Sequence, residues 1–267
     1  MLYTSIHVSG NVLTEEILHT VETDSTYTGN ADRDFGAVDN LSAAIDYAWS
    51  SLRHDYSFFA SRPLDRDQYG TSRARALTER LLLSLGYSLS RCSEKTVVDE
   101  VGYDLTYVDR NLHSFPFIVV GDVAVSANSE SSADKKSISS LDARNKGMHK
   151  QRSAHATMLA YLNSTDHIYG IVANGVSLRL IRSSGQLVKL SYIEFDIRKM
   201  VEEDKYTEFC LMFRLLHASR FLVDGDNACI MERWFNASIE SGNRIRDGLS
   251  LFLSHAISDL RRRREQA

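Results

Sequence analysis

The stretch Asp166 to Ile197 reads DHIYGIVANGVSLRLIRSSGQLVKLSYIEFDI, and its pattern decides the fold. Asn174-Gly175 separates two β-rich runs, and both residue types tolerate the positive φ of a type I′ turn, so the pair predicts a tight hairpin. A second turn over Ser183 to Gly185 precedes a third run, Leu187 to Ile193. Three adjoining strands with an apolar face form a stable sheet. We therefore expect the other elements to pack around this sheet.

The second of these runs contains two arginines that we expect to project from the hairpin. Val176, Leu178 and Leu180 fall on one side of the strand. Arg179 falls on the other side and should face away from the core. At such positions Arg179 and Arg182 would meet phosphate groups or pair with surface carboxylates. Both interpretations stay open at this point.

The rest of the chain alternates helical and extended patterns. Apolar spacing predicts helices at residues 15–21, 38–61, 71–85, 153–163, 202–221, 228–239 and 245–264. Strand patterns occur at residues 2–8, 97–108 and 115–125, and the last is apolar at successive positions, as in a strand covered on both faces. The pattern predicts an α/β (α+β) fold with a central mixed sheet. We expect one compact unit of three parts: a helical N-terminal lobe (1–95), an α/β core (96–200) and a C-terminal helical cap (201–267).

Composition limits the classes of function. The formal net charge is −4, so any contact with nucleic acid requires a local basic face. Cys92, Cys210 and Cys229 have neither disulfide nor zinc-site spacing, which suits a reducing compartment. No apolar run approaches the roughly 20 residues of a membrane span, and no signal peptide is recognisable. We expect a cytoplasmic protein with no membrane partner.

One local basic cluster is present. Residues 126–150 are serine-rich and aperiodic, which predicts a long loop. The cluster is formed by Lys135, Lys136, Arg144, Lys146, Lys150 and Arg152. It is interpreted either as a solvated loop or as a surface that contacts DNA phosphates.

Motifs of several enzyme classes are absent. Neither G-x-G-x-x-G nor G-x-x-x-x-G-K-[ST] occurs, and neither G-x-S-x-G nor H-E-x-x-H is found. His155 and His217 fall on predicted helices, and we interpret both as structural residues. A DNA methyltransferase would need a cofactor loop and an N-P-P-Y motif, and this chain contains neither.

The order helix, strands, helix, hairpin is that of a PD-(D/E)XK nuclease core. Such a nuclease needs one acid at a strand end and an acid-x-Lys set on the next strand, which hold Mg²⁺ and activate water. Asp104 is the candidate for the first acid. The next strand begins FPFIVVGD and is apolar where the metal ligands belong, so the available substitutes are Asp122, Glu130 and Lys135. We expect a nuclease-like scaffold without catalytic residues or metal, with an active Mg²⁺-dependent endonuclease as the alternative.

Seven segments carry a resemblance to a known family. They are AIDYAWSSL (Ala44 to Leu52), TSRARALTERLLLSLGYS (Thr71 to Ser88), LDAR (Leu141 to Arg144), SAHATMLAYLN (Ser153 to Asn163), HIYGIVANGVSLRLIRSS (His167 to Ser184), YIEFDI (Tyr192 to Ile197) and RLLHASRF (Arg214 to Phe221). Together they resemble the N-terminal region of large bacterial adenine-specific restriction-modification methylases of type IIG character. The likeness is closest to methylases of phage-defence islands such as DISARM. By the same resemblance, Leu159 stands where active nucleases of this kind often present a glutamine.

The resemblance implies a nuclease-derived domain in a system that defends against foreign DNA. It also implies N6-adenine methylation that uses S-adenosylmethionine in a partner or in another part of the protein. We expect this chain to be a fragment or a stand-alone homologue that acts with such a partner. The leading hypothesis is a non-catalytic domain that contacts duplex DNA or assembles the methylase. A second alternative to it, besides the nuclease, is a pure interaction module that docks a methyltransferase subunit through Trp234, Phe235 and Phe252.

Overall fold

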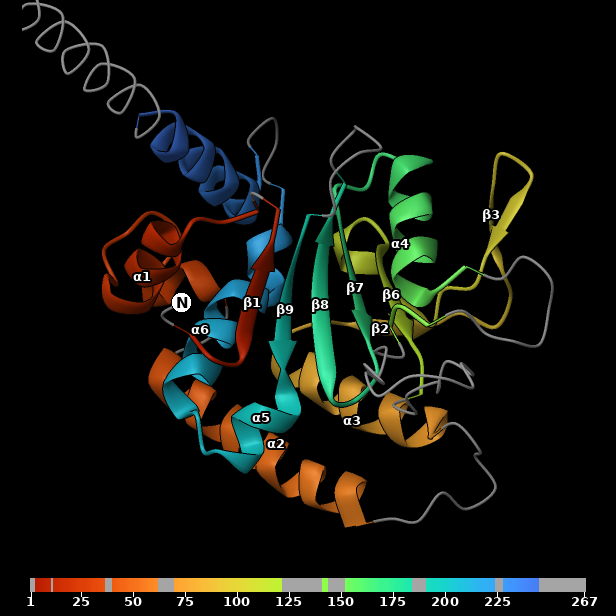
Figure 1. The fold of residues 1–267 in the computed structure, drawn as a ribbon, viewed down its shortest axis with the longest axis horizontal. Helices are drawn as coiled ribbons and strands as arrows, with labels where there is room; N and C mark the ends of the chain where they lie inside the picture. Colours follow the sequence, from red (N-terminus) through yellow and green to blue (C-terminus); the bar gives the residue numbers. More distant parts are fainter. Residues whose placement is uncertain are drawn as a thin grey trace, which may run out of the picture.

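A seven-stranded mixed sheet forms the centre of this α/β protein (Figure 1). The computed structural model describes residues 3–10, 12–36, 40–61, 70–121, 141–143, 152–183, 191–223 and 228–244. The strands are β1 (Ile6–Ser9), β2 (Leu89–Arg91), β3 (Thr96–Val98), β4 (Val101–Tyr103), β5 (Tyr107–Asp109), β6 (Phe115–Val119), β7 (Tyr169–Ala173), β8 (Ser177–Arg182) and β9 (Tyr192–Asp196). The α-helices are α1 (Glu15–Thr23), α2 (Leu41–Ser61), α3 (Thr71–Ser84), α4 (Ala154–Asn163), α5 (Ile197–Glu202) and α6 (Tyr206–Leu216), and residues 230–244 are also helical. Short 3₁₀ turns are η1 (Asp32–Phe35), η2 (Arg110–Leu112) and η3 (Ala218–Phe221).

The strands of the sheet follow the order β1-β9-β8-β7-β6-β5-β2. All neighbouring pairs are antiparallel except β6 and β7, which are parallel. A parallel pair cannot be closed by a tight turn, and here the connection includes α4. The first 95 residues supply β1 and β2, so the expected helical lobe is continuous with the central sheet. β3 and β4 form a separate two-stranded sheet.

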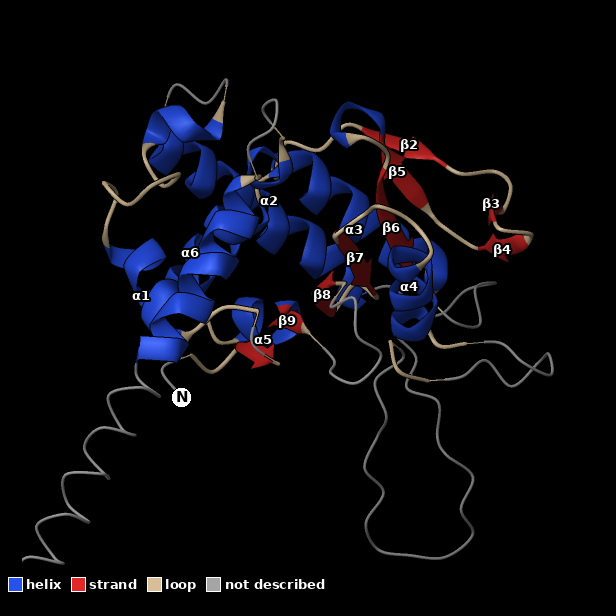
Figure 2. Ribbon diagram, turned by 90° about the horizontal axis from the view of Figure 1, so that it is seen from above, coloured by secondary structure: helices blue, strands red, loops and turns tan. Residues whose placement is uncertain are grey.

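Helices cover both faces of the sheet (Figure 2). On one face α2, α3 and α6 enclose the larger apolar core, to which the strands contribute Phe117, Leu180 and Phe195. On the other face α4 packs against β6, β7 and β8. Val172 and Ile181 point into this second core. The prediction that the strand at residues 115–125 is covered on both faces is confirmed for β6, because all five of its residues are buried. Residues 122–125 lie outside the described part of the chain.

The turn between β7 and β8 lies one residue later than predicted. Ala173 pairs with Leu178, so Gly175 and Val176 occupy the tip. Gly175 has a φ of 87° and is the member of this turn with a positive φ, as in a type II′ turn and not in type I′. The Asn174 side chain instead accepts hydrogen bonds from the backbone N–H of Val176 at 3.1 Å and of Ser177 at 2.7 Å.

Two predicted helices differ from the observed ones. The spacing of apolar residues in 153–163 predicts that Ala156, Leu159, Ala160 and Leu162 lie on or near the buried side of α4. The buried residues are instead Ala154, His155, Met158, Tyr161 and Leu162, and Leu159 is only partly buried. The predicted helix 202–221 is interrupted at Asp204, whose φ of 51° is incompatible with a continuous helix, and it divides into the end of α5, α6 and η3. The predicted helix 245–264 lies outside the described residues. No helix in the described part of the chain has both the length and the apolar content needed to cross a membrane.

The tip of the β7–β8 turn packs closely against two helices, which gives a test of the arrangement. A Cβ at Gly175 would lie 2.8 Å from Phe59 Cε2 and 3.2 Å from Ala74 Cα. We predict that Gly175→Ala lowers the free energy of unfolding by about 2–6 kcal/mol, from backbone strain at a positive φ (about 1–3 kcal/mol) plus overpacking (about 1–3 kcal/mol). Gly36 also has a positive φ, 72°, but a Cβ there would meet nothing within 4 Å, so Gly36→Ala should lose only the cost of backbone strain, about 1–3 kcal/mol. Equal losses in urea titrations of the two variants would contradict the packing described.

Candidate functional site

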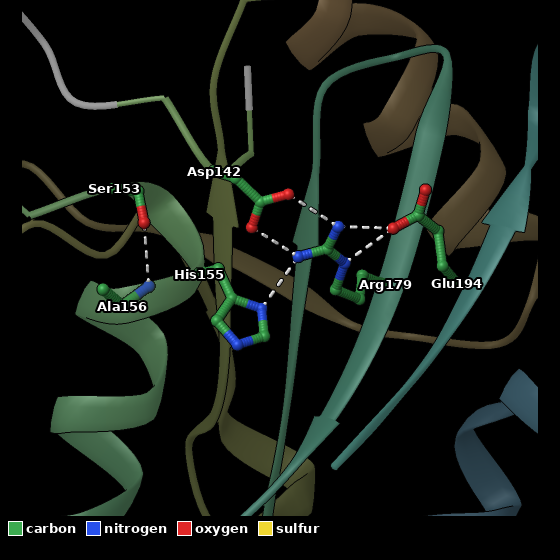
Figure 3. A network of polar contacts seen from close by, with 6 residues as sticks. All are labelled: Asp142, Ser153, His155, Ala156, Arg179 and Glu194. Atoms are coloured by element: carbon green, nitrogen blue, oxygen red, sulfur yellow. Dashed lines mark hydrogen bonds and ion pairs between the residues drawn. The ribbon is translucent and has the colours of Figure 1, made fainter. Parts of the chain in front are cut away.

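A polar network around a buried arginine lies on the α4 face of the sheet (Figure 3). Its members are Arg179 on β8, Glu194 on β9, His155 on α4, and Asp142 from the short described segment 141–143. Each comes from a different segment of those that carry the family resemblance: HIYGIVANGVSLRLIRSS, YIEFDI, SAHATMLAYLN and LDAR. Four segments that are separate in the sequence therefore meet around one guanidinium group.

Arg179 is the centre of this network, and its side chain is 4% exposed. Its Nη1 and Nη2 donate to the two carboxylate oxygens of Asp142 at 2.8 and 3.0 Å. Its Nε and Nη2 donate to Oε2 of Glu194 at 2.8 and 2.5 Å. The guanidinium carbon also lies 4.2 Å from the centroid of the Tyr192 ring. The planar fork of an arginine suits this paired recognition of two carboxylates, which a lysine could not reproduce.

The expectation that Arg179 faces solvent is wrong. The strand does alternate as predicted, with Leu178 and Leu180 in the larger core. The opposite face, however, is covered by α4, and Ile181 on that face is fully buried. Arg179 stands directly opposite Glu194 in the antiparallel pair β8–β9, where cross-strand side chains are closest. The buried face thus contains a charged residue because its partner strand supplies the neutralising acid.

His155 is held neutral by its surroundings. Its Nδ1 lies 2.9 Å from Arg179 Nη1. Because the guanidinium can only donate, Nδ1 accepts and the proton of the neutral ring resides on Nε2. Burial, followed by the positive charge of Arg179, lowers the pKa of His155 to about 4. Among the described residues Nε2 has no hydrogen-bond partner. The interpretation of His155 as structural agrees with this geometry.

The segment 141–143 is fixed to the sheet through this network. Leu141 is fully buried in the core under α4, and its carbonyl accepts a hydrogen bond from the His155 backbone N–H at 3.0 Å. Burial alone would raise the pKa of Asp142, but the hydrogen bond and charge of Arg179 outweigh it and lower the pKa. Leu141 and Asp142 therefore attach the chain to α4 and β8 in the middle of the predicted basic loop.

Arg182, the second arginine expected to project, is also paired within the protein. Its Nη2 and Nε donate to the Glu232 carboxylate at 2.6 and 3.1 Å. Its guanidinium carbon lies 3.5 Å from the centroid of the Phe235 ring, and the Tyr169 hydroxyl donates to the same Glu232 at 2.7 Å. This contact fastens the helix 230–244 to β7 and β8. Arg182 therefore does not project freely from the hairpin, because this helix supplies a carboxylate and an aromatic ring that bind it.

Of the other predicted DNA-binding residues, the structure describes only Arg152. Arg152 is exposed just before α4. The remaining members of the basic cluster, Lys135, Lys136, Arg144, Lys146 and Lys150, lie outside the described residues. For the interaction-module alternative, Trp234 is 1% exposed and belongs to the larger core, whereas Phe252 lies outside the described residues.

Of the residues proposed for a nuclease, the structure describes only Asp104. Asp104 is exposed, and its carboxylate lies 3.3 Å from Lys95 Nζ. Asp122, Glu130 and Lys135 lie outside the described residues. Within the described part of the chain, no group of three or more His, Cys, Asp or Glu side chains is arranged to hold a metal ion. β6, where the acid-x-Lys set would belong, contributes its side chains to the two cores.

Sequence reasoning missed two acids of the network, Asp142 and Glu194. A signal for Glu194 exists in the sequence, since it alternates with Ile193 and Phe195 and so shares a face with its cross-strand arginine. No such signal exists for Asp142, whose contact depends on where the chain returns to α4. No protein-family model, curated protein or solved structure matches this chain. The arrangement of these residues, beside the resemblance, is therefore the basis for assigning a function.

Removal of the central guanidinium should be far more costly than removal of a surface charge. We predict that Arg179→Met lowers the free energy of unfolding by about 2–4 kcal/mol, because two carboxylates lose their partner. Asp142→Asn should cost about 1 kcal/mol, since that side chain is 44% exposed and reaches water. The control is Lys95→Met, which removes an exposed pair worth under about 0.5 kcal/mol. A loss for Arg179→Met no larger than for the control, in urea titrations, would refute the network.

The neutral His155 predicts a pH dependence of stability. The pKa of His155, and likewise that of His217, is lowered from 6.5 to about 4, first by burial and then by a neighbouring arginine. The unfolded chain takes up these protons as the pH falls below 6.5 while the folded chain does not. Stability should therefore decrease between pH 6.5 and about 4, by up to ~1.4 kcal/mol per pH unit for each histidine.

The variant His155→Gln keeps an acceptor for Arg179 but cannot titrate. We predict that it reduces the slope of unfolding free energy against pH by up to one proton in this window. An unchanged slope for His155→Gln would show that His155 binds protons equally in the folded and unfolded chain, which would contradict the lowered pKa.

Proposed function

We propose that this chain is a non-catalytic domain of a bacterial restriction-modification or phage-defence adenine methylase system. In this role it contacts duplex DNA and assembles with a methyltransferase domain or subunit. Its fold would be that of a PD-(D/E)XK nuclease whose metal pocket has been replaced by apolar side chains. S-adenosylmethionine belongs, in this proposal, to the methyltransferase partner, and Mg²⁺ would be needed only by an active nuclease.

The observation that carries the proposal is the character of β6. Apart from the β3–β4 hairpin between β2 and β5, the elements α3, β2, β5, β6, α4 and β7 come in the order expected of a nuclease core, and β8 then pairs with β7. In such a core the strand before the crossover helix supplies the acid and the lysine. Here Phe117 is fully buried, and Ile118 and Val119 are 5% and 3% exposed. A hydrated metal ion would have no oxygen ligand from these side chains.

The buried network supports the assignment to this family. The resemblance rests on short segments that are individually weak. One of them contains Arg179, and three others each contribute a polar partner to its guanidinium. A buried charge is strongly destabilising if any of its partners is missing, so all of them must be present together. The segments are thus coupled by one physical requirement, which supports reading them as a single motif.

In this proposal Arg179 has a positioning role in DNA contact. Its guanidinium already pairs with Asp142 and Glu194, so Arg179 would not contact phosphate itself. It would act by holding Leu141 and Asp142 against the sheet. The contact with phosphate falls to Arg152 and to the basic residues that precede it in the sequence. Phosphate contacts of this kind bind without sequence preference and weaken as salt is added.

Binding of the chain to a labelled duplex, measured by fluorescence anisotropy at low and at physiological salt, tests DNA contact. We predict binding at low salt that weakens about a hundredfold at physiological salt, as expected for roughly five phosphate contacts. The variant that replaces Lys135, Lys136, Arg144, Lys146 and Lys150 with alanine should lose most of this affinity. The matched control replaces five exposed arginines elsewhere, Arg33, Arg91, Arg110, Arg198 and Arg244, and should retain it. No binding at low salt would remove DNA contact from the proposal.

The non-catalytic part of the proposal has its own test. The purified chain, incubated with supercoiled plasmid and Mg²⁺, should leave the plasmid intact. Nicking that disappears in an Asp104→Asn variant would instead establish the endonuclease alternative.

A further inference from the structure

The β3–β4 hairpin stands apart from the main sheet, at the end of the molecule opposite α1 (Figures 1 and 2). Its base is fixed to α4 through Tyr103, whose hydroxyl lies 3.0 Å from Ser164 Oγ. The ring of Tyr103 also packs edge-on against Tyr161, with 5.4 Å between the ring centroids. Across the base, Lys95 and Asp104 form an ion pair of 3.3 Å. The hairpin is therefore presented in a defined orientation.

The turn of this hairpin is unusual in its residues. Asp99 and Glu100 have φ values of 46° and 63°, which are the left-handed values of a two-residue hairpin turn normally occupied by Asn-Gly or Asp-Gly. An L-residue such as glutamate adopts this conformation at a cost. The turn thus presents two carboxylates at the tip although a glycine would relax the backbone.

The body of the hairpin is apolar and open. Val97 is 67% exposed and Val101 is 46% exposed. Within the described residues β3 pairs only with β4, and β4 only with β3. Alternate residues of each strand accordingly direct their backbone N–H and C=O away from the partner strand. An open strand edge with exposed β-branched side chains is a template for another strand.

The charge of the hairpin indicates which kind of partner could bind along its open edge. Residues 93–104 contain four acids, Glu94, Asp99, Glu100 and Asp104, and one base, Lys95. These carboxylates would repel a phosphate backbone. They would also repel the same hairpin on a second copy of the chain. An extended protein segment that carries lysine or arginine could pair with the open strand edge and neutralise the acidic residues.

We infer that the β3–β4 hairpin is a docking surface for a basic, extended segment of a partner protein, which adds as a strand along β3. Backbone hydrogen bonds to the open edge would supply affinity, Val97 would be covered by apolar side chains, and Asp99 and Glu100 would pair with basic ones. The inference rests on the assembly role in the proposed function. It does not depend on DNA contact, which would use a different, basic part of the chain.

A model peptide provides the probe. A short labelled peptide of alternating lysine and valine should bind the full chain, and its binding should slow the amide hydrogen exchange of residues 96–98. A peptide of alternating glutamate and valine should not bind, because it brings carboxylates against the acidic tip. A lysine-valine peptide interrupted by a central proline should not bind either, because proline cannot donate to a strand edge. Absence of binding by the uninterrupted lysine-valine peptide, or slowed exchange elsewhere but not at 96–98, would overturn the inference.

Two variants separate docking from a structural role of the hairpin. Asp99→Asn combined with Glu100→Gly relieves the turn and removes both carboxylates, so the Tm should be retained or raised while the peptide affinity falls about three- to tenfold. Val97→Ser should also weaken peptide binding. Its matched control is Val223→Ser, at a valine that is 51% exposed away from the hairpin, which should bind as the unmodified chain does. Unchanged peptide affinity in both hairpin variants would overturn the inference.

Duplex DNA binding, measured on the same variants, distinguishes this inference from the DNA-contact proposal. The hairpin variants should bind DNA as well as the unmodified chain does, and the variant of the basic cluster should still bind the peptide. Loss of both activities in the hairpin variants would indicate a general structural defect and contradict a local docking surface.

Discussion

The burial of one positive charge constrains the α4 face of this protein. A guanidinium removed from water is unfavourable unless carboxylates and hydrogen bonds replace its hydration. Arg179 meets that requirement with Asp142, Glu194 and the neutral ring of His155. Each partner comes from a different element, so the requirement fixes the register of β8 against β9, the orientation of α4 and the return of the chain at residue 142. One side chain thereby couples four separate segments of the chain.

Two further arginines are used in the same structural way, with different partners. Arg182 pairs with Glu232 and stacks on Phe235, which joins the sheet to the helix 230–244. Arg220 is fully buried and donates to the backbone carbonyls of Gly29 and Asp34 and to its neighbour Ser219. Burial lowers the pKa of Arg220 to about 10, which still leaves it charged at neutral pH. Arginines in this chain are therefore poor indicators of a nucleic-acid surface unless their partners are known.

The local elements were largely predictable because their signals are local. The stripe of Leu41, Ile45 and Leu52 predicts the buried side of α2, and Thr14 caps α1 as its position suggests. The surroundings of Arg179 were not predictable in the same way. Period-2 alternation separates the two faces of a strand, but it does not say whether a helix covers the second face. Ile181, an apolar residue on the same face as Arg179, was the available hint that α4 lies there.

The candidate site shows the same division between local and distant information. The apolar character of β6, on which the non-catalytic proposal depends, is visible in the sequence and is matched by the burial of Phe117 and Ile118. The contact of Asp142 with Arg179 spans 37 positions in the chain, and no spacing rule connects the two. The open β3–β4 hairpin was likewise not predicted, because the pattern of residues 97–108 did not indicate a turn at Asp99 and Glu100.

A double-mutant cycle on Arg179 and Asp142 tests the central claim most directly. The free energy of unfolding would be measured for the unmodified chain, Arg179→Met, Asp142→Asn and the double variant. If the guanidinium holds residue 142 against the sheet, the two substitutions should be coupled by at least about 1 kcal/mol. Losses that add within about 0.3 kcal/mol would mean that the two residues act independently. That result would contradict the account of Arg179 as the group that organises this face of the protein.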